Sequence, residues 1–77
     1  MTLSDLGIGA RAVVMGVHGG LGLRRRLGDV GVRPGGTVEV LRSGAQGGPV
    51  LLAVHGARVA VGQRQARRVD VELLDGR

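Results

Sequence analysis

Short stretches in which apolar and polar residues alternate recur along the chain, and they predict β-strands. The cleanest covers residues 68–73, where valines alternate with aspartate and glutamate. Residues 37–40 and 50–55 also place every second apolar side chain on one face, which we expect to cover a core. The residues expected to point inward from these two strands are Val38, Val40, Val50, Leu52 and Val54.

Two further strands are predicted from weaker patterns. Residues 10–17 alternate imperfectly, because two valines are adjacent and Gly16 interrupts the strand, and this indicates a bulge or a sharp bend. A tight hairpin turn is expected at 55–58, followed by a strand in which Val59 and Val61 point inward.

One helix is predicted over about 21–30. Leu23, Leu27 and Val30 lie at positions i, i+4 and i+7, so they are expected to share the buried face while the intervening arginines point elsewhere. Gly31 stands where a left-handed residue would end the helix. The arginines therefore belong to the exposed part of a short, capped helix.

The order of these elements predicts a mainly β fold: a small SH3-like barrel of about five strands, with one short helix after the first strand and a helical turn before the last. That turn is expected over 62–67, with Ala66 pointing to the core, and Leu3 and Leu6 are expected to pack against the barrel. We expect a single domain over 1–77, because a chain of this length forms one core.

Composition narrows the classes of function. The chain has no cysteine, which excludes disulfides and thiolate metal sites, and it has no aromatic residue. No apolar run is long enough to cross a bilayer and no export signal is visible, so a cytoplasmic protein is expected.

The formal charge of +5 raises the alternative of a small basic nucleic-acid-binding barrel. All eleven basic residues are arginine, and they are dispersed along the chain. Barrels that bind nucleic acid usually add stacking aromatics to a basic groove, and these are absent here. We therefore expect no specific nucleic-acid partner, although this alternative stays open.

Few side chains could bind a metal or act in catalysis. His18 and His55 could join Asp29 or Glu72 in a site of two histidines and one carboxylate, but they lie in glycine turns without a metal-ligand spacing. The two serines have no histidine at a fixed spacing, and the glycine-rich stretches do not form a phosphate loop. We expect no catalytic residue, no bound metal and no cofactor.

Several short motifs occur in a characteristic order. The chain opens with a Leu-x-x-Leu-x-x-Gly pattern and continues with Arg-Arg-Leu-x-x-x-Gly-x-x-Pro-Gly, a Gly-x-Pro-Val entry into a strand, a later glycine, a helical turn and a final Val-x-Val. In this order they resemble the FeoA family, the small cytoplasmic partners of the ferrous-iron transporter FeoB. The residues that carry the resemblance are Leu3, Leu6, Gly9, Arg25, Arg26, Leu27, Gly31, Pro34, Gly35, Gly47, Pro49, Val50, Gly56, Ala66, Val69 and Val71.

The resemblance implies an SH3-like barrel without enzymatic activity that assists ferrous-iron uptake. It implies contact with the GTP-binding region of FeoB at its cytoplasmic face, and with the membrane only through FeoB. Loops and exposed faces are the expected contact surfaces, which here means the helix arginines, the loop 44–48 and a small apolar patch on the strand at 50–55; a weak homo-oligomer using that patch is also open. The partner-binding residues expected are Arg24, Arg25, Arg26, Leu51 and Ala53.

Overall fold

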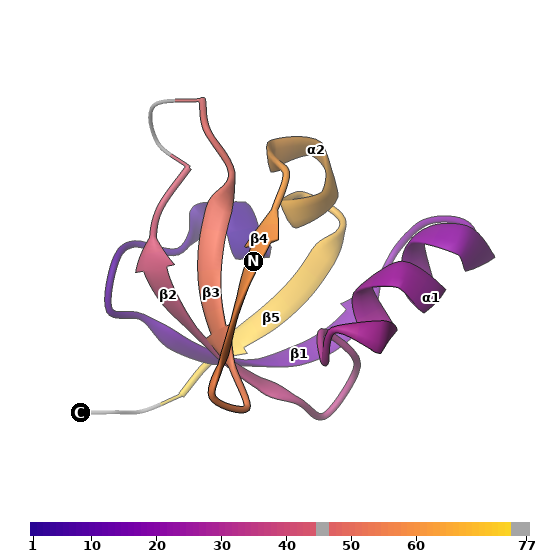
Figure 1. The fold of residues 1–77 in the computed structure, drawn as a ribbon, viewed down its shortest axis with the longest axis horizontal. Coiled ribbons are helices and arrows are strands. Elements are labelled where there is room, and N and C mark those ends of the chain that lie inside the picture. Colours follow the sequence, from indigo (N-terminus) through magenta and orange to yellow (C-terminus); the bar gives the residue numbers. More distant parts are fainter. Residues whose placement is uncertain (45–46, 75–77) are drawn as a thin grey trace.

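A computed structural model describes residues 1–44 and 47–74. Five antiparallel strands form one sheet in the order β4-β3-β2-β1-β5, and Figure 1 shows it strongly coiled. The mainly β class is confirmed. The elements in chain order are η1 (Leu3–Asp5), β1 (Arg11–Val17), α1 (Leu21–Asp29), β2 (Thr37–Arg42), β3 (Val50–Val54), β4 (Ala57–Val61), α2 (Gln63–Ala66) and β5 (Val69–Leu73).

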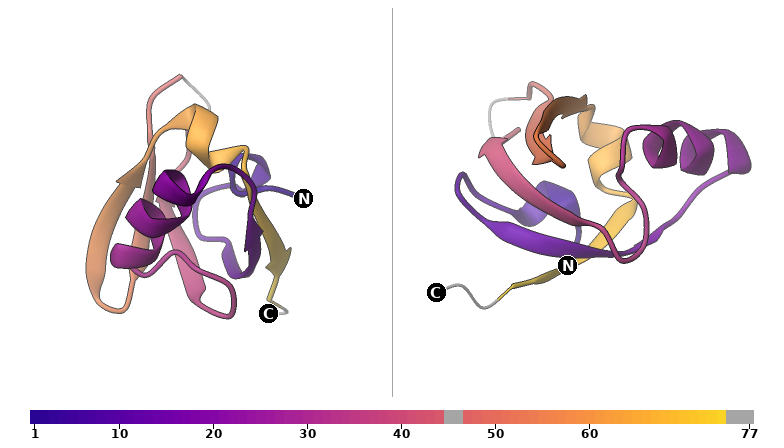
Figure 2. Two further views of the ribbon diagram at one scale, coloured as in Figure 1. Left: turned by 90° about the vertical axis from the view of Figure 1, so that its right-hand side faces the viewer. Right: turned by 60° about the horizontal axis from the view of Figure 1, so that its bottom comes forward.

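A core made mostly of valine and leucine fills the inside of the sheet, and Figure 2 shows how the sheet coils in two further views. The inward residues expected for β2 and β3 are all buried, so the two-residue periodicity is confirmed there. Leu3, Leu6 and Ala66 are also buried, as expected. The buried residues are Leu3, Leu6, Ala12, Val14, Leu27, Val32, Val38, Val40, Val50, Leu52, Val54, Val61, Ala66, Val69 and Val71.

The interruption predicted in the first strand is a register shift. In the ladder between β1 and β5 the pairing moves by one residue between Val14 and Gly16, so Met15 has no partner opposite it. Beyond the shift β1 pairs with β5 alone, because its ladder with β2 ends at Val13. The other edge of β1 bonds instead to a turn: the Val14 N–H donates to the Gly36 carbonyl at 2.8 Å.

Helix α1 begins and ends close to its predicted bounds, but it is held by fewer side chains than expected. Leu27 is buried and Leu23 packs against the core, whereas Val30 is 42% exposed. The prediction for Val30 was wrong because the helix ends at Asp29 and Val30 is its C-cap, where the backbone turns away. Figure 1 accordingly shows α1 standing out to one side of the sheet.

Gly31 ends α1 as predicted. Its φ is +94°, and the N–H groups of Gly31 and Val32 donate to the carbonyls of Gly28 and Leu27 at 3.0 and 2.9 Å. This pair of bonds is a Schellman motif, which satisfies carbonyls left free at the end of a helix. The motif turns the chain so that Val32 enters the core.

The loop between β2 and β3 is anchored from α2. The side-chain amide of Gln63 donates to the carbonyl of Gly44 and, at 2.9 Å, to the carbonyl of Gly48. Residues 45–46 of the loop predicted at 43–48 lie outside the described residues.

Candidate functional site

The residues predicted to bind a partner lie on two separate surfaces. Arg24, Arg25 and Arg26 are exposed on α1, which projects beyond one side of the sheet. Leu51 and Ala53 lie on β3, inside the sheet order, with side chains on its outer face. The structure therefore does not bring the two groups together.

The α1 arginines spread around the helix. Successive residues of an α-helix point about 100° apart, so the three side chains cannot share one face. Arg24 lines a hollow of about 240 Å³ with Val17 and Pro34, while the helical rotation places Arg25 on the side of the helix opposite Leu23 and Leu27. Within residues 1–44 and 47–74 none of the three forms an ion pair, so the helix presents free positive charge to solvent.

Leu51 belongs to an apolar groove that sequence reasoning did not find. It lines a groove of about 420 Å³ with Ile8, Pro49 and Ala60, and Arg42 lies at the same groove. Ile8 is 71% exposed, and what makes it informative is that it shares one groove with Leu51, Pro49 and Ala60, because a lone exposed aliphatic side chain is ordinary. The sequence offered one signal for this groove. Ile8 stands between two glycines at a turn, so its side chain has no neighbouring side chain to cover it.

Ala53 has different surroundings. Its neighbours across the sheet are Glu39 on β2 and Arg58 on β4, and Glu39 is in turn opposite Arg11 on β1. Alternating charges thus run across the outer face of the sheet at this level. Ala53 is half-buried among them and adds little to an apolar patch.

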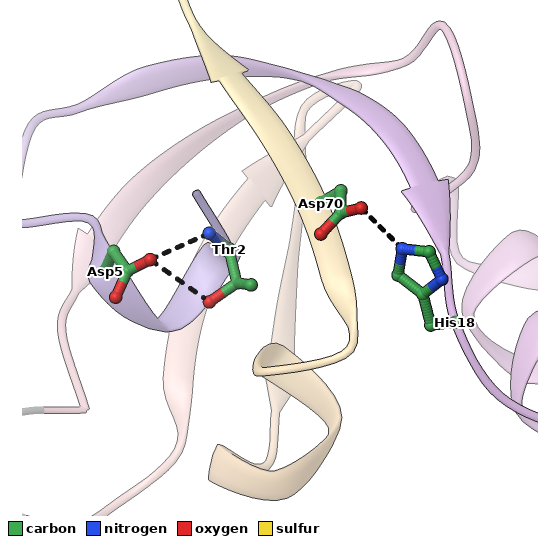
Figure 3. A network of polar contacts seen from close by, with 4 residues as sticks. All are labelled: Thr2, Asp5, His18 and Asp70. Atoms are coloured by element: carbon green, nitrogen blue, oxygen red, sulfur yellow. Dashed lines mark hydrogen bonds and ion pairs between the residues drawn. The ribbon is translucent and has the colours of Figure 1, made fainter.

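The two histidines are placed apart. Nε2 of His18 lies 2.5 Å from Oδ2 of Asp70 on β5 (Figure 3), whereas His55 lies in the turn between β3 and β4, against Gly31. Asp70 was not among the candidate carboxylates named from the sequence. The register shift in β1 places Asp70 opposite Gly16, near His18. In the described part of the chain no three histidine, aspartate or glutamate side chains come close enough together to hold a metal ion.

A second polar pair lies beside the other edge of β5, away from His18 (Figure 3). The Thr2 N–H donates to Oδ2 of Asp5 at 2.8 Å, and Thr2 also bridges to Asp70 through the backbone (Figure 3). Asp5, the third residue of η1, thereby caps the first turn of this short helix. These contacts fix the lead-in segment alongside the last strand.

All charged side chains of the described residues reach solvent. The surfaces therefore offer recognition by charge, by apolar contact and by free backbone groups. None of the helices in the described ranges is long and apolar enough to cross a membrane.

Comparison with known proteins gives a consistent picture. A family model described as the FeoA domain matches residues 1–73. A Methanocaldococcus jannaschii protein provisionally named Fe(2+) transport protein A is 31% identical over 64 residues, which are 83% of this chain and 76% of that protein.

Two solved structures extend the likeness to the fold. A crystal structure described as iron uptake regulatory protein (FeoA) has a TM-score of 0.90 at 38% identity and covers 96% of this chain and 97% of its own. The FeoA of Stenotrophomonas maltophilia, a prokaryotic SH3 domain protein crystallised with zinc, has a TM-score of 0.80 at 34% identity and covers 94% and 89%. The SH3-like fold expected from the order of elements is thereby confirmed.

Proposed function

The chain belongs to the FeoA family of small accessory proteins of ferrous-iron transport, and from that premise we propose that it is a non-catalytic protein that binds and modulates FeoB. It acts at the cytoplasmic face, on the GTP-binding region of FeoB, and reaches the membrane only through this partner. The whole of 1–77 acts as one domain.

The observation that carries this proposal is the exposed, unpaired charge of α1. The helix stands away from the barrel, and its three arginines have no ion-pair partner within the described ranges. A surface helix with free arginines suits an acidic surface on another protein, because charge complementarity raises the association rate and selects the partner.

The test is charge reversal on α1. We expect the double variant Arg24→Glu, Arg25→Glu to lose binding to the soluble GTP-binding region of FeoB in calorimetry, and cells carrying it to lose ferrous-iron uptake. Arg64→Glu, at an exposed position on α2, is the matched control and should bind normally. Normal binding and normal uptake by the double variant would exclude the α1 surface.

The apolar groove at Leu51 is the second contact surface that we propose. A polar substitution of Ile8, which is 71% exposed, removes apolar contact without touching the core (Ile8→Asp). We expect weaker binding to FeoB with unchanged thermal stability. The same variant distinguishes a homo-oligomer: if the groove joins two copies instead, the effect will appear in the mass of the protein alone.

The competing function is binding of nucleic acid by the arginine surface. Such binding is dominated by phosphate contacts and falls steeply with salt. A salt-sensitive shift with generic RNA, together with no binding to the FeoB region, would favour it.

We also propose that iron binding is not part of the protein's action. The S. maltophilia relative was crystallised with zinc, but here the histidines lie on different elements, one beside Asp70 and one in a turn. Anaerobic calorimetry with Fe²⁺ is expected to give at most weak binding. A stoichiometric site that His18→Ala or His55→Ala abolishes would make the protein an iron carrier.

A further inference from the structure

Strand β4 forms one margin of the sheet, and its outer edge is open. The sheet order ends at β4, and Figure 2 shows the strand at that margin. At the other margin, β5 is covered by the lead-in segment: Thr2 bridges to Asp70, and the Val71 N–H donates to the Met1 carbonyl at 3.0 Å. One edge of the sheet, β5, is therefore covered by backbone pairing, whereas the other, β4, is open.

The hairpin between β3 and β4 determines which backbone groups face outward. The turn residues His55 and Gly56 have φ values of +50° and +80°, as a two-residue type I′ turn requires, so Val54 and Ala57 form the hydrogen-bonded pair that closes it. Such pairs alternate along an antiparallel ladder. The next bonded pair therefore contains Val59.

Arg58 and Ala60 stand on either side of Val59 in β4. Their N–H and C=O groups consequently point away from β3. Within residues 1–44 and 47–74 no backbone bond from outside the strands reaches either residue. Both residues are exposed. The edge thus presents two donors and two acceptors at the spacing of a β-ladder.

Each face of this edge is bordered by a groove. On one side a groove of about 480 Å³ lies between β4 and the end of α1, lined by Val30 and Val59 among others. On the outer face Ala60 lines the apolar groove of Ile8 and Leu51. An added strand would therefore find apolar surface for side chains on both of its faces.

Charge identifies the kind of strand that fits. Arg58 and Arg33 line the groove beside α1, against the single carboxylate of Asp29, and Arg42 lies at the outer groove. A second copy of the chain is a poor occupant, because pairing β4 with β4 so that Arg58 lies opposite Arg58 or Ala60 of the second copy places the two Arg58 side chains on the same face, opposite or diagonal to each other. The surface favours an acidic partner.

We propose that β4 binds an extended acidic segment of a partner protein as a sixth strand. In antiparallel register its successive residues are apolar opposite Ala60, aliphatic opposite Val59 and acidic opposite Arg58. The aliphatic side chain enters the groove with Val30, because residues opposite each other in a ladder point to the same face. Main-chain bonds give the affinity, and the alternating side chains give the specificity.

The β4 edge is a different surface from the α1 arginines proposed to contact FeoB, and binding at one does not depend on binding at the other.

The probe is the blocked peptide acetyl-Ser-Thr-Val-Ile-Glu-Thr-Ser-amide, added to the full chain labelled with ¹⁵N. We expect the amides of Arg58 and Ala60 to exchange rapidly in the free protein and to slow by about tenfold at ten times the Kd of the peptide. The amide of Val59, already bonded to β3, should change far less. This pattern of alternate protection is specific to strand addition.

Two controls separate backbone pairing from attraction of charge. A peptide methylated at the nitrogens of valine and glutamate cannot donate to β4 and should not bind. Replacing the peptide glutamate with lysine should weaken binding by up to about fivefold, and Arg58→Glu in the protein should reverse that preference. Arg25→Glu on α1 should leave peptide binding unchanged, which distinguishes this surface from the one proposed for FeoB.

Unchanged exchange at Arg58 and Ala60, or equal binding of the methylated peptide, would overturn the proposal. It would also fail if the free protein formed a dimer that already protects these two amides, because a second copy would then occupy the edge.

Discussion

His18 and Asp70 join the two strands that close the fold: Nε2 of His18 lies 2.5 Å from Oδ2 of Asp70, just beyond the register shift in β1. Both side chains are open to solvent, His18 at 69% and Asp70 at 45% exposed. Water competes for such a pair and salt screens it, so a short distance does not make it a strong contributor to stability.

We therefore expect Asp70→Asn to lower the free energy of unfolding by less than about 1 kcal/mol. Urea denaturation in low salt measures the change, and His18→Asn should give a similar small value. A loss of several kcal/mol from either substitution would mean that the pair holds β1 and β5 together.

Two glycines at the end of α1 give opposite predictions. Gly31 has φ +94°, and a Cβ there would lie 2.7 Å from Cγ1 of Val54, so Gly31→Ala should cost about 1–3 kcal/mol. Gly28 lies inside α1, and a Cβ added there would meet no atom within 4 Å outside its own helix backbone and chain neighbours, so Gly28→Ala should stabilise by up to about 1 kcal/mol. Thermal unfolding should show Tm moving down for the first variant and up for the second.

The hydrogen bonds from Gln63 to the β2–β3 loop predict a local effect on stability. Gln63→Ala removes the donor to the carbonyls of Gly44 and Gly48 and should cost about 0.5–1.5 kcal/mol. Amide exchange near Gly48 should rise more than exchange in β1. Gln65→Ala, on the same helical turn, is the control, since Gln65 makes no side-chain bond to this loop among the described residues.

Neighbouring leucines on β3 test the inward and outward faces. Leu52 is fully buried, so Leu52→Ala should cost about 2–5 kcal/mol, a large part of the stability of so small a protein. Leu51 is half-buried on the outer face, and Leu51→Ala should cost about 1 kcal/mol. Equal losses in chemical denaturation would contradict the assigned strand faces.

Local patterns predicted the parts of the fold that depend on local rules. Alternation located the inward faces of β2 and β3, and the glycine at 31 located the end of α1. Val30 was misplaced because the helical spacing continues in the sequence one residue past the point where the backbone leaves the helix. The i, i+4, i+7 spacing of apolar residues does not indicate the residue at which a helix ends.

The surface contacts were less accessible to sequence reasoning. The partner of His18 depends on a ladder between distant strands and on a one-residue shift within it, neither of which is encoded next to His18. The groove at Leu51 likewise needs Ile8 from a turn far away in sequence. The open edge of β4 follows only from the order of the strands.

The pairing of β1 with β5 also governs when the molecule can form. Val17 pairs with Val69 and Ala12 with Leu73, so β1 waits for a segment that is made more than fifty residues later. Bringing such distant segments together is slow, since the entropy of closing a long loop is lost before the contacts form. During synthesis on the ribosome, β2, β3 and β4 can pair in turn as they emerge, but β1 keeps an uncovered side until residues 69–73 leave the exit tunnel. Shielding of that side by a chaperone would matter most in this interval.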